Sequence, residues 1–417
     1  MAERCERCGT ALGRYAQPGA CPACRAGGAA LTAPGPRLAP GVWLWSDPAA
    51  AAALSSGDLA IILRAYRAAN GLSQAALAAL LGYSNSYVAL IESRRRTPHD
   101  VAGRRHIARA LGLPFHLLGV TDPDDADFAA LCHFGDAVVR LAEIARQSGR
   151  VVEAVNELWP LAARLEARAA EGRLERETLR LLASARLALG VSLGTVLPEE
   201  RLTGAAVWTG KALLLARHLD DAPFLAHTLR MHGNELRKAG RLTAAVARLE
   251  HAAAVSCEPA GRGSALALLA RAAGDAGMSD TFDAAVDGCR RALDSGAEHG
   301  MLLNPFTLRE IRARGLLALG RPGDALRVLR SSGADEPVAP QWRVIESVTT
   351  GEVLAAAGER DGSAEALRAA IATAEQRRLP HQLQRAIRAA RRGGLDSVVD
   401  TGLAALRRLR GLLSPTA

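Results

Sequence analysis

The stretch GLSQAALAALLGYSNSYVALIESRRRTP, from Gly71 to Pro98, decides the fold near the amino terminus of this chain. Ser73 is a good N-cap for a helix whose leucines fall on one side, and Gly82 ends that helix. Ser84 then caps a second short helix whose inner face carries apolar residues three apart. Two short helices with so tight a join must cross steeply, and this crossing predicts a helix-turn-helix.

The outward side chains of the second helix predict a surface that reads DNA. The crossing presents the amino end of this helix to a major groove, which is about 12 Å wide in B-DNA. Asparagine can bridge the donor and acceptor of adenine, serine is permissive, and alanine or leucine can meet a thymine methyl. The residues expected at the bases are Ser84, Asn85, Ser86, Ala89 and Leu90. The residues expected to grip phosphates on either side are Gln74, Arg94, Arg95 and Arg96.

The same stretch resembles the Cro-type repressor family, often called XRE-like. It fits the pattern LSQxxLAxxxGxSxxxVxxIExxRRxP, and the match continues through IARALGLPFHLLG at residues 107–119. The resemblance implies that Gln74 and the outward residues after the Ser84 cap touch an operator. At Arg94 and the residue before it the sequence departs from the pattern, because the family usually closes the recognition helix with a glycine there. The alternative interpretation is a helical hairpin with no nucleic-acid role.

Further helices are expected on both sides of this pair. Thr97 and Pro98 read as a cap followed by a first-turn proline, which predicts a helix from there to about Leu111. Upstream, Trp43 and Trp45 precede the helical segments DPAAAAAL and DLAIILRAYRAAN, and we expect them to extend the hydrophobic core of the same unit. The predicted DNA-binding domain therefore has five helices and spans residues 43–120.

Composition and charge agree with a helical DNA-binding protein. The 417 residues exceed one ordinary domain, and 49% apolar against 4% aromatic residues favours packed helices. Residues 1–120 hold 13 Arg and 6 acidic residues, so they carry +7 of the net +9. Neither a run of 18 or more apolar residues nor a signal-peptide core is visible. We therefore expect a cytoplasmic, nucleoid-associated protein without membrane contact.

Two CxxC pairs near the amino terminus predict a structural zinc site. The pairs are separated by twelve residues, and four thiolates at that spacing can close a tetrahedral Zn²⁺ site. The segment resembles a small zinc ribbon, whose folding energy would come from the metal. Thiol redox chemistry is the competing interpretation, although no strand-helix unit surrounds the CPAC motif. The expected ligands are Cys5, Cys8, Cys21 and Cys24, in a ribbon over residues 1–26 followed by a Gly, Ala and Pro-rich linker over residues 27–42.

The remainder of the chain, residues 121–417, predicts an α-solenoid. Alanine-leucine helices alternate with short turns centred on glycine, and the later turns recur about every 40 residues. Such helix pairs cannot bury a face alone, so they stack. The segments KAGRLTAAVARLE and ALGRPGDALRVLR resemble tetratricopeptide repeats, with a generic helical array as the alternative. The predicted fold class is all-α: a helix-turn-helix domain, a solenoid of such helix pairs, and the zinc ribbon.

A solenoid offers a concave surface to a peptide, a small ligand or a protein partner. Arg230, Asn234 and Arg237 follow the spacing i, i+4, i+7, which suits a peptide backbone or a carboxylate. The alternative is an ordinary exposed helix face. The segment GVSLG at residues 190–194 lacks the strand-turn-helix context of a catalytic serine, and residues 204–211 form a poor phosphate loop. We therefore predict no enzyme.

Together these features predict a transcription regulator that reads an operator as a homodimer. The repeats would sense an effector, and resemblance to peptide-responsive regulators favours a short peptide. A rotation between repeat domains would break the half-site spacing of about 34 Å that a dimer needs. The rival prediction is a scaffold or adaptor whose repeats and zinc ribbon bind proteins without functional DNA binding. An antitoxin-like or phage-defence regulator shares the DNA-binding step and differs in its partner.

Overall fold

The computed structural model describes residues 37–98, 100–121, 128–172, 174–297, 300–331 and 338–413, and their regular structure is helical throughout. The predicted all-α fold class is thereby confirmed for this part of the chain. The described residues from Leu38 onward belong to one compact unit. The four predicted zinc ligands lie outside the described residues.

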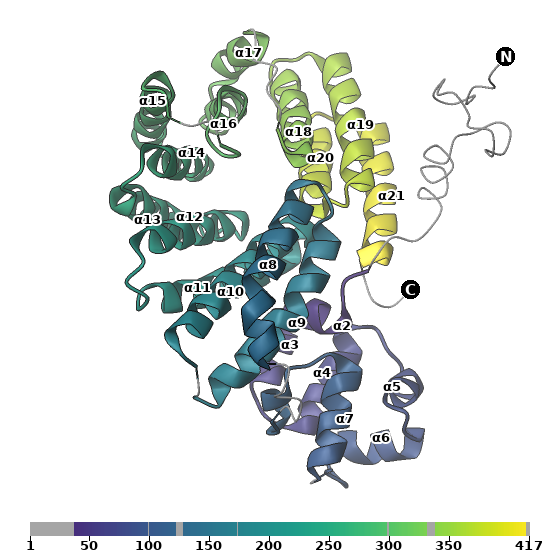
Figure 1. Cartoon of the computed structure of the whole chain (residues 1–417). Helices are drawn as coiled ribbons and strands as arrows, with labels where there is room; N and C mark the ends of the chain where they lie inside the picture. The colour runs from purple at the N-terminus through teal and green to yellow at the C-terminus, as the bar shows by residue number, and fades with distance from the viewer. Residues whose placement is uncertain are drawn as a thin grey trace, which may run out of the picture. The chain divides into compact units, whose positions relative to one another are not determined.

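Short helices with tight turns build the helix-turn-helix domain (Figure 1). They are α2 (Pro40–Trp45), α3 (Pro48–Leu54), α4 (Leu59–Ala69), α5 (Gln74–Leu81), α6 (Asn85–Glu92), α7 (Val101–Leu111) and the 3₁₀ helix η1 (Phe115–Leu118). One hydrophobic core joins α3 to α7, with Tyr66, Leu77 and Ile107 almost fully buried. Burial of these side chains supplies most of the driving force that holds the short helices together.

The prediction that Pro98 opens the helix after the recognition helix is wrong. That helix, α7, begins at Val101, and Asp100 caps it by accepting a hydrogen bond from the Gly103 backbone N at 2.6 Å. A carboxylate at the N-cap also interacts favourably with the helix dipole, which a hydroxyl cannot do. The carbonyl of Pro98 instead accepts from Nε of Arg104 at 2.9 Å. The predicted end at Leu111 is confirmed.

From residue 128 onward the chain forms consecutive helix pairs (Figure 1). The pairs are α8 (Phe128–Gln147) with α9 (Val151–Ala170), α10 (Arg176–Val196) with α11 (Leu202–Ala216), α12 (Ala222–Lys238) with α13 (Leu242–Val255), α14 (Pro259–Asp275) with α15 (Ser279–Asp294), α16 (Pro305–Ala318) with α17 (Pro322–Arg330), α18 (Pro340–Ala356) with α19 (Arg360–Gln376), and α20 (Pro380–Arg392) with α21 (Asp396–Leu413). The 3₁₀ helix η3 (Glu199–Arg201) joins α10 to α11. Turn glycines such as Gly240 (φ 75°) and Gly320 (φ 72°) take the left-handed conformation, so the predicted glycine-centred turns are confirmed.

The array closes on itself, which the repeat pattern does not predict. Helix α20 packs against α10 and η3, and one hydrophobic core contains side chains from both ends of the array. The Gln384 side chain accepts from the Glu199 backbone N at 2.9 Å and donates to the Glu200 carboxylate at 3.0 Å. Arg410 adds an ion pair with Glu200 at 2.6 Å. These contacts bring the last pairs against the first and enclose the inner surface of the array.

Helix α10 runs through the middle of this packing. By length and composition it is long and apolar enough to cross a membrane, but 61% of the apolar window is buried among other helices. Its glycines allow close approach: a Cβ on Gly190 would lie 2.6 Å from Thr209 Cγ2, and one on Gly194 would overlap the Glu235 carboxylate. The GVSLG segment is therefore explained by helix packing.

A cluster of tryptophans joins the helix-turn-helix domain to the repeats. The expectation that both tryptophans extend the core of the DNA-binding domain is confirmed for Trp45, which packs against that core and against the core of the repeats, and is wrong for Trp43, which belongs to the core of the repeats. The Trp45 ring lies 6.4 Å from that of Trp159 and 5.9 Å from that of Trp208. Arg201 of η3 stacks over Trp43 at 3.7 Å and donates to its backbone carbonyl at 2.6 Å. The linkage between the two domains is thus packed rather than extended.

Candidate nucleic-acid interface and repeat cavity

Local capping sets the geometry of the helix-turn-helix. Ser73 Oγ accepts from the Ala76 backbone N at 3.1 Å and starts α5. Gly82, with φ 66°, ends α5, and Ser84 Oγ accepts from the Tyr87 backbone N at 3.2 Å to start α6. Each predicted boundary of the two helices is confirmed, because serine caps and left-handed glycine act on neighbouring residues alone.

The outward face of α6 is available to a ligand. Asn85 and Ser86 are exposed at its amino end, Leu90 is exposed one turn further on, and Ala89 is half-buried. The opposite face packs into the core through Val88, which is fully buried. Ser84 is exposed as well, but its hydroxyl already serves the cap. The arrangement leaves Asn85 and Ser86 as the polar side chains best presented to base edges.

Gln74 is tied to the recognition helix, and its partner Glu92 escaped the sequence analysis. The Gln74 amide donates to the Glu92 carboxylate at 2.9 Å, and Nε of Arg67 donates to the other oxygen at 3.0 Å. Glu92 is 6% exposed at the last residue of α6. A buried glutamate thus fixes α4, α5 and α6 relative to one another and sets the direction in which Gln74 points. The glutamate after isoleucine in the pattern LSQxxLAxxxGxSxxxVxxIExxRRxP corresponds to Glu92 and could have indicated this role.

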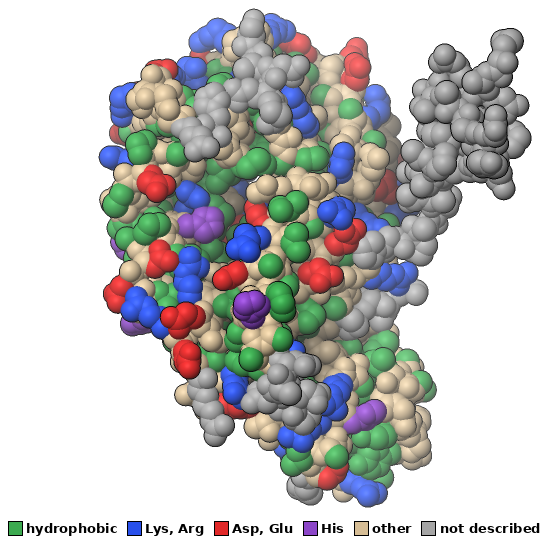
Figure 2. All heavy atoms as spheres, viewed as in Figure 1, with side chains coloured by type: hydrophobic (Ala, Val, Ile, Leu, Met, Phe, Trp, Pro, Cys, Tyr) green, Lys and Arg blue, Asp and Glu red, His purple; other side chains and the backbone are tan. Residues whose placement is uncertain are grey.

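The three consecutive arginines after α6 are all exposed, but they have different surroundings. Arg94 adopts φ 60°, a left-handed conformation that favours glycine, and its Nε lies 3.0 Å from Asp58. Arg96 stacks over the Tyr87 ring at 5.1 Å. Arg95 is the most freely presented of the three. In Figure 2 the lower part of the view, where α4 to α7 lie, carries several basic and few acidic side chains.

A cavity of about 360 Å³ opens on the inner surface of the repeats. Its walls come mainly from the first helix of successive pairs: α8, α10, α12, α14, α18 and α20. Arg230, Asn234 and Arg237 all line it, so the alternative of an ordinary exposed helix face does not hold. Closure of the array explains the depth of the site, because α20 completes a wall that starts at α8.

The charge of Arg237 is already held within the protein. Its guanidinium donates to Asp275 at 2.9 Å and to the Asn234 side chain at 3.2 Å. Arg314 approaches both oxygens of Asp275 at 3.2 Å. Burial alone would raise the pKa of Asp275, but Arg314 and Arg237 hold it well below the ordinary value. Arg237 is therefore a structural side chain at the cavity wall, whereas Arg230 keeps its Nε without a hydrogen bond.

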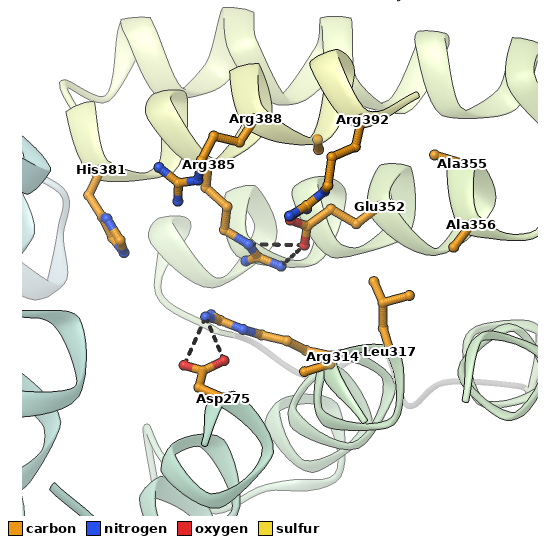
Figure 3. A pocket seen from close by; sticks show the side chains of 12 residues that line it. Asp275, Arg314, Leu317, Glu352, Ala355, Ala356, His381, Arg385, Arg388 and Arg392 are labelled. Carbon is orange, nitrogen blue, oxygen red and sulfur yellow. Dashed lines mark hydrogen bonds and ion pairs between the residues drawn. The ribbon is translucent and has the colours of Figure 1, made fainter. Parts of the chain in front are cut away.

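Figure 3 shows a neighbouring cavity, of about 540 Å³, in which paired charges recur. Arg314 rises from α16 to Asp275, and Arg385 of α20 points to Glu352 of α18. Nε of Arg385 lies 3.0 Å from Glu352, which also pairs with Arg392 at 3.0 Å. Burial tends to raise the pKa of Glu352, but the charge of Arg385 lowers it. These ion pairs connect the first helices of consecutive pairs, α14 to α16 and α18 to α20.

One cavity residue that the sequence analysis missed is Arg271 of α14. It is 6% exposed, lines the smaller cavity and stacks over Trp342 at 5.1 Å. In the segment ALLARAAGDAG it looks like any arginine on an alanine-rich helix. Within the described ranges, no group of three or more His, Cys, Asp or Glu side chains is placed to hold a metal ion.

One comparison with known proteins identifies the helix-turn-helix. Residues 58–118 match the family model described as a helix-turn-helix domain. No curated protein matches the chain. A similar solved structure is the crystal structure of Bacillus thuringiensis PlcR in complex with the peptide PapR7 and DNA, which covers 74% of this chain and 99% of that chain at 16% identity and a TM-score of 0.35. A likeness this weak carries no argument about function.

Proposed function

We propose that this protein is a DNA-binding transcription regulator whose repeats receive an effector in the inner cavity. One observation carries the proposal: Asn85 and Ser86 are exposed at the capped amino end of α6, and Arg95 is exposed just after its carboxyl end. A helix presented in this way fits a major groove, with asparagine at base edges and arginine at phosphates. The domain match at residues 58–118 and the basic surplus before residue 121 support it.

We further propose that the protein binds its operator as a homodimer. Phe134, Leu141 and Ile144 are exposed on α8 at spacings of seven and three residues, the interval of a helix-pairing seam. A second copy of α8 is a fitting partner for such a seam. A dimer bound to one face of DNA needs its recognition helices about 34 Å apart. A ligand in the cavity would act by changing that distance through the packed tryptophan junction.

Two more parts of the proposal concern the effector and the amino terminus. The effector is a peptide, a small ligand or a protein partner that enters the cavity of the repeats. Cys5, Cys8, Cys21 and Cys24 hold a structural Zn²⁺, because four thiolates in two CxxC pairs match its tetrahedral preference. The protein acts in the cytoplasm and catalyses no reaction.

Selection of genomic DNA fragments by the full-length protein, followed by footprinting and titration at several salt concentrations, tests the DNA-binding proposal. We expect two protected half-sites about one helical turn apart. Asn85→Ala should cost about 1–3 kcal/mol at one base position, because one bidentate base contact is lost. Arg95→Ala should weaken binding to all fragments alike and reduce the salt slope by about 1, because one phosphate contact is lost.

Arg327→Ala is the matched control, since Arg327 is an exposed arginine of the repeats whose side chain pairs with Asp324. This substitution removes the same charge from the chain and should leave the salt slope unchanged. Operator binding that survives both Asn85→Ala and Arg95→Ala would exclude the groove assignment. A stable protein complex formed without any DNA binding would favour the scaffold or adaptor function instead.

A further inference from the structure

Arg271 is a buried cation for which the described residues provide no hydrogen bond and no ion pair. Its Nε has no partner, and the guanidinium rests on Trp342 at 5.1 Å. Arginine is rarely buried without a carboxylate, because removing its charge from water costs several kcal/mol. Arg271 is an exception to this rule, and it lies in the wall of the 360 Å³ cavity.

The two acidic groups whose charges act on Arg271 form no ion pair with it. Asp275, one turn further along α14, already accepts from Arg237 and Arg314. Glu310 is buried, accepts from Thr349 Oγ1 at 2.8 Å through one oxygen and has no hydrogen bond at the other, and it acts on Arg271 only through space. Burial, and then the charge of Arg237, lowers the pKa of Arg271 well below its ordinary value. The guanidinium is therefore under-neutralised in the protein alone.

The other cavity walls hold mostly paired charges and limit the size of a guest. Three of the lining cations are ion-paired, Arg146 with Glu143, Arg237 with Asp275 and Lys238 with Glu235, which leaves Arg230 and Arg271 without a carboxylate among the described residues. Amides from Gln341 and Gln382 and apolar surface from Met301 and Ile345 complete the lining. A volume of 360 Å³ is at the small end of ligand sites, which run from about 300 to 1,000 Å³. It suits a compact molecule better than an extended peptide.

We propose that the effector site binds a small molecule carrying an oxyanion, a carboxylate or a phosphate, which pairs with Arg271 over Trp342. The aromatic face fixes the plane of the guanidinium, so its free N–H groups point at a guest lying in that plane. The oxyanion supplies the negative charge that no described side chain places against Arg271, and the apolar wall contacts the remainder of the ligand. This inference rests on the proposed effector role of the cavity and replaces the peptide expectation with a ligand class.

Thermal unfolding of the full-length protein in low-salt buffer gives the first test. Arg271→Met keeps the length and the contact with Trp342 but removes the unpaired charge, so we expect a higher Tm than that of the unaltered protein, by about 2–4 °C for each kcal/mol gained in a domain of this size. Arg314→Met is the matched control, because that arginine is largely buried and is paired with the Asp275 carboxylate, and it should lower the Tm. A lower Tm for Arg271→Met would show a structural role and overturn the proposal.

Calorimetric titration gives the second test, at constant ionic strength. The probes are phenylacetate and phenyl phosphate, with phenylacetamide and phenol as neutral counterparts. We expect at least one anion to bind, its neutral counterpart to bind at least tenfold more weakly, and Arg271→Met to abolish the difference. The stronger of the two anions identifies the oxyanion. Equal binding of acids and neutral compounds, or no binding by either anion, would overturn the proposal.

Neither test involves DNA, so the two proposals fail separately. If the protein binds the anion but selects no DNA fragment, the cavity assignment stands and the regulator proposal fails. Operator binding without Arg271-dependent anion binding would do the reverse. The Asn85→Ala variant should titrate with the same anion as the unaltered protein, because Asn85 lies in the helix-turn-helix domain and not in the cavity wall.

Discussion

The helix-turn-helix domain and the inner surface of the repeats use arginine in opposite ways. After α6, Arg94, Arg95 and Arg96 are exposed, and their charges remain hydrated. Inside the array, Arg237 and Arg385 are almost fully buried, and each has a carboxylate within 3.0 Å. An exposed arginine keeps its hydration, so folding costs it little free energy and its charge stays available to phosphates. A buried arginine loses that hydration and needs a carboxylate partner to offset the loss. Burial thus distinguishes an arginine that can bind a ligand from one that stabilises the fold. Arg271 fits neither type, because it is buried but has no carboxylate partner among the described residues.

Among the substitutions that test this comparison, Asp275→Asn should have the largest effect on the free energy of unfolding. The substitution leaves Arg237 and Arg314 buried without their counter-charge, which should lower the free energy of unfolding by about 3–5 kcal/mol. The matched change is Asp58→Asn in the helix-turn-helix domain. Asp58 pairs with an exposed Arg94, and asparagine can still cap α4, so about 0–1 kcal/mol is expected.

Urea unfolding of both variants, followed by far-UV circular dichroism, gives the two free energies. Equal losses for Asp275→Asn and Asp58→Asn would mean that water reaches the interior cluster, and the contrast between the regions would disappear. The pH dependence of the same measurement adds a second criterion. Since the pKa of Asp275 is held low, its contribution is present above the unfolded carboxyl pKa of about 4 and is lost as pH falls towards the folded value.

What the sequence could predict follows from the range of the interactions involved. Ser73, Gly82 and Ser84 act on residues within one helical turn, so the boundaries of α5 and α6 were predictable. The exposed face of α6 followed from the same register. The helix start predicted at Pro98 was wrong because Asp100, two residues further on, is the residue that caps α7. Local signals therefore fail only where two of them compete.

Closure of the array could not be predicted in the same way. Glu199 and Gln384 meet across 185 residues, and no local pattern marks either of them as a contact. Arg271 shows the consequence for the site, because its sequence context resembles that of the paired Arg314 and only the folded array separates the two. The spacing of Arg230 and Arg237 did indicate a common face, although not that Asp275 would neutralise one of them.

A smaller effect is expected from acidification of the repeats. His232 is buried against Thr209, with Nδ1 3.0 Å from Oγ1. Desolvation, and then the charge of Arg248, lowers the pKa of His232 to about 4 from 6.5. The neutral form is therefore favoured in the fold, so stability is complete above pH 6.5 and is lost as pH falls towards 4. At pH 5 the loss from this residue should be about 2 kcal/mol.

The variant His232→Gln isolates this contribution. We expect it to be less stable than the unaltered protein at pH 7, yet to lose about 2 kcal/mol less between pH 7 and pH 5, because glutamine does not titrate. Unfolding in urea at the two pH values gives the double difference, from which other histidines cancel. A pH dependence unchanged by the substitution would show that His232 titrates normally, and the interior would then tolerate a cation as the surface does.

The smallest effect concerns the left-handed residue that ends the recognition helix. A side chain at φ 60° costs about 1 kcal/mol relative to glycine, while the exposed pair with Asp58 returns between about 0 and 1 kcal/mol. Arg94→Gly should therefore leave stability nearly unchanged, and Arg94→Ala, which loses the pair but keeps the backbone cost, should be about 1 kcal/mol less stable than Arg94→Gly. Thermal unfolding of the two variants measures this difference, and both should lower the salt slope of operator binding equally if Arg94 contacts a phosphate. An alanine variant as stable as the glycine variant would mean that the helix ends without left-handed strain, and the departure from the family pattern at this position would then have no structural cost.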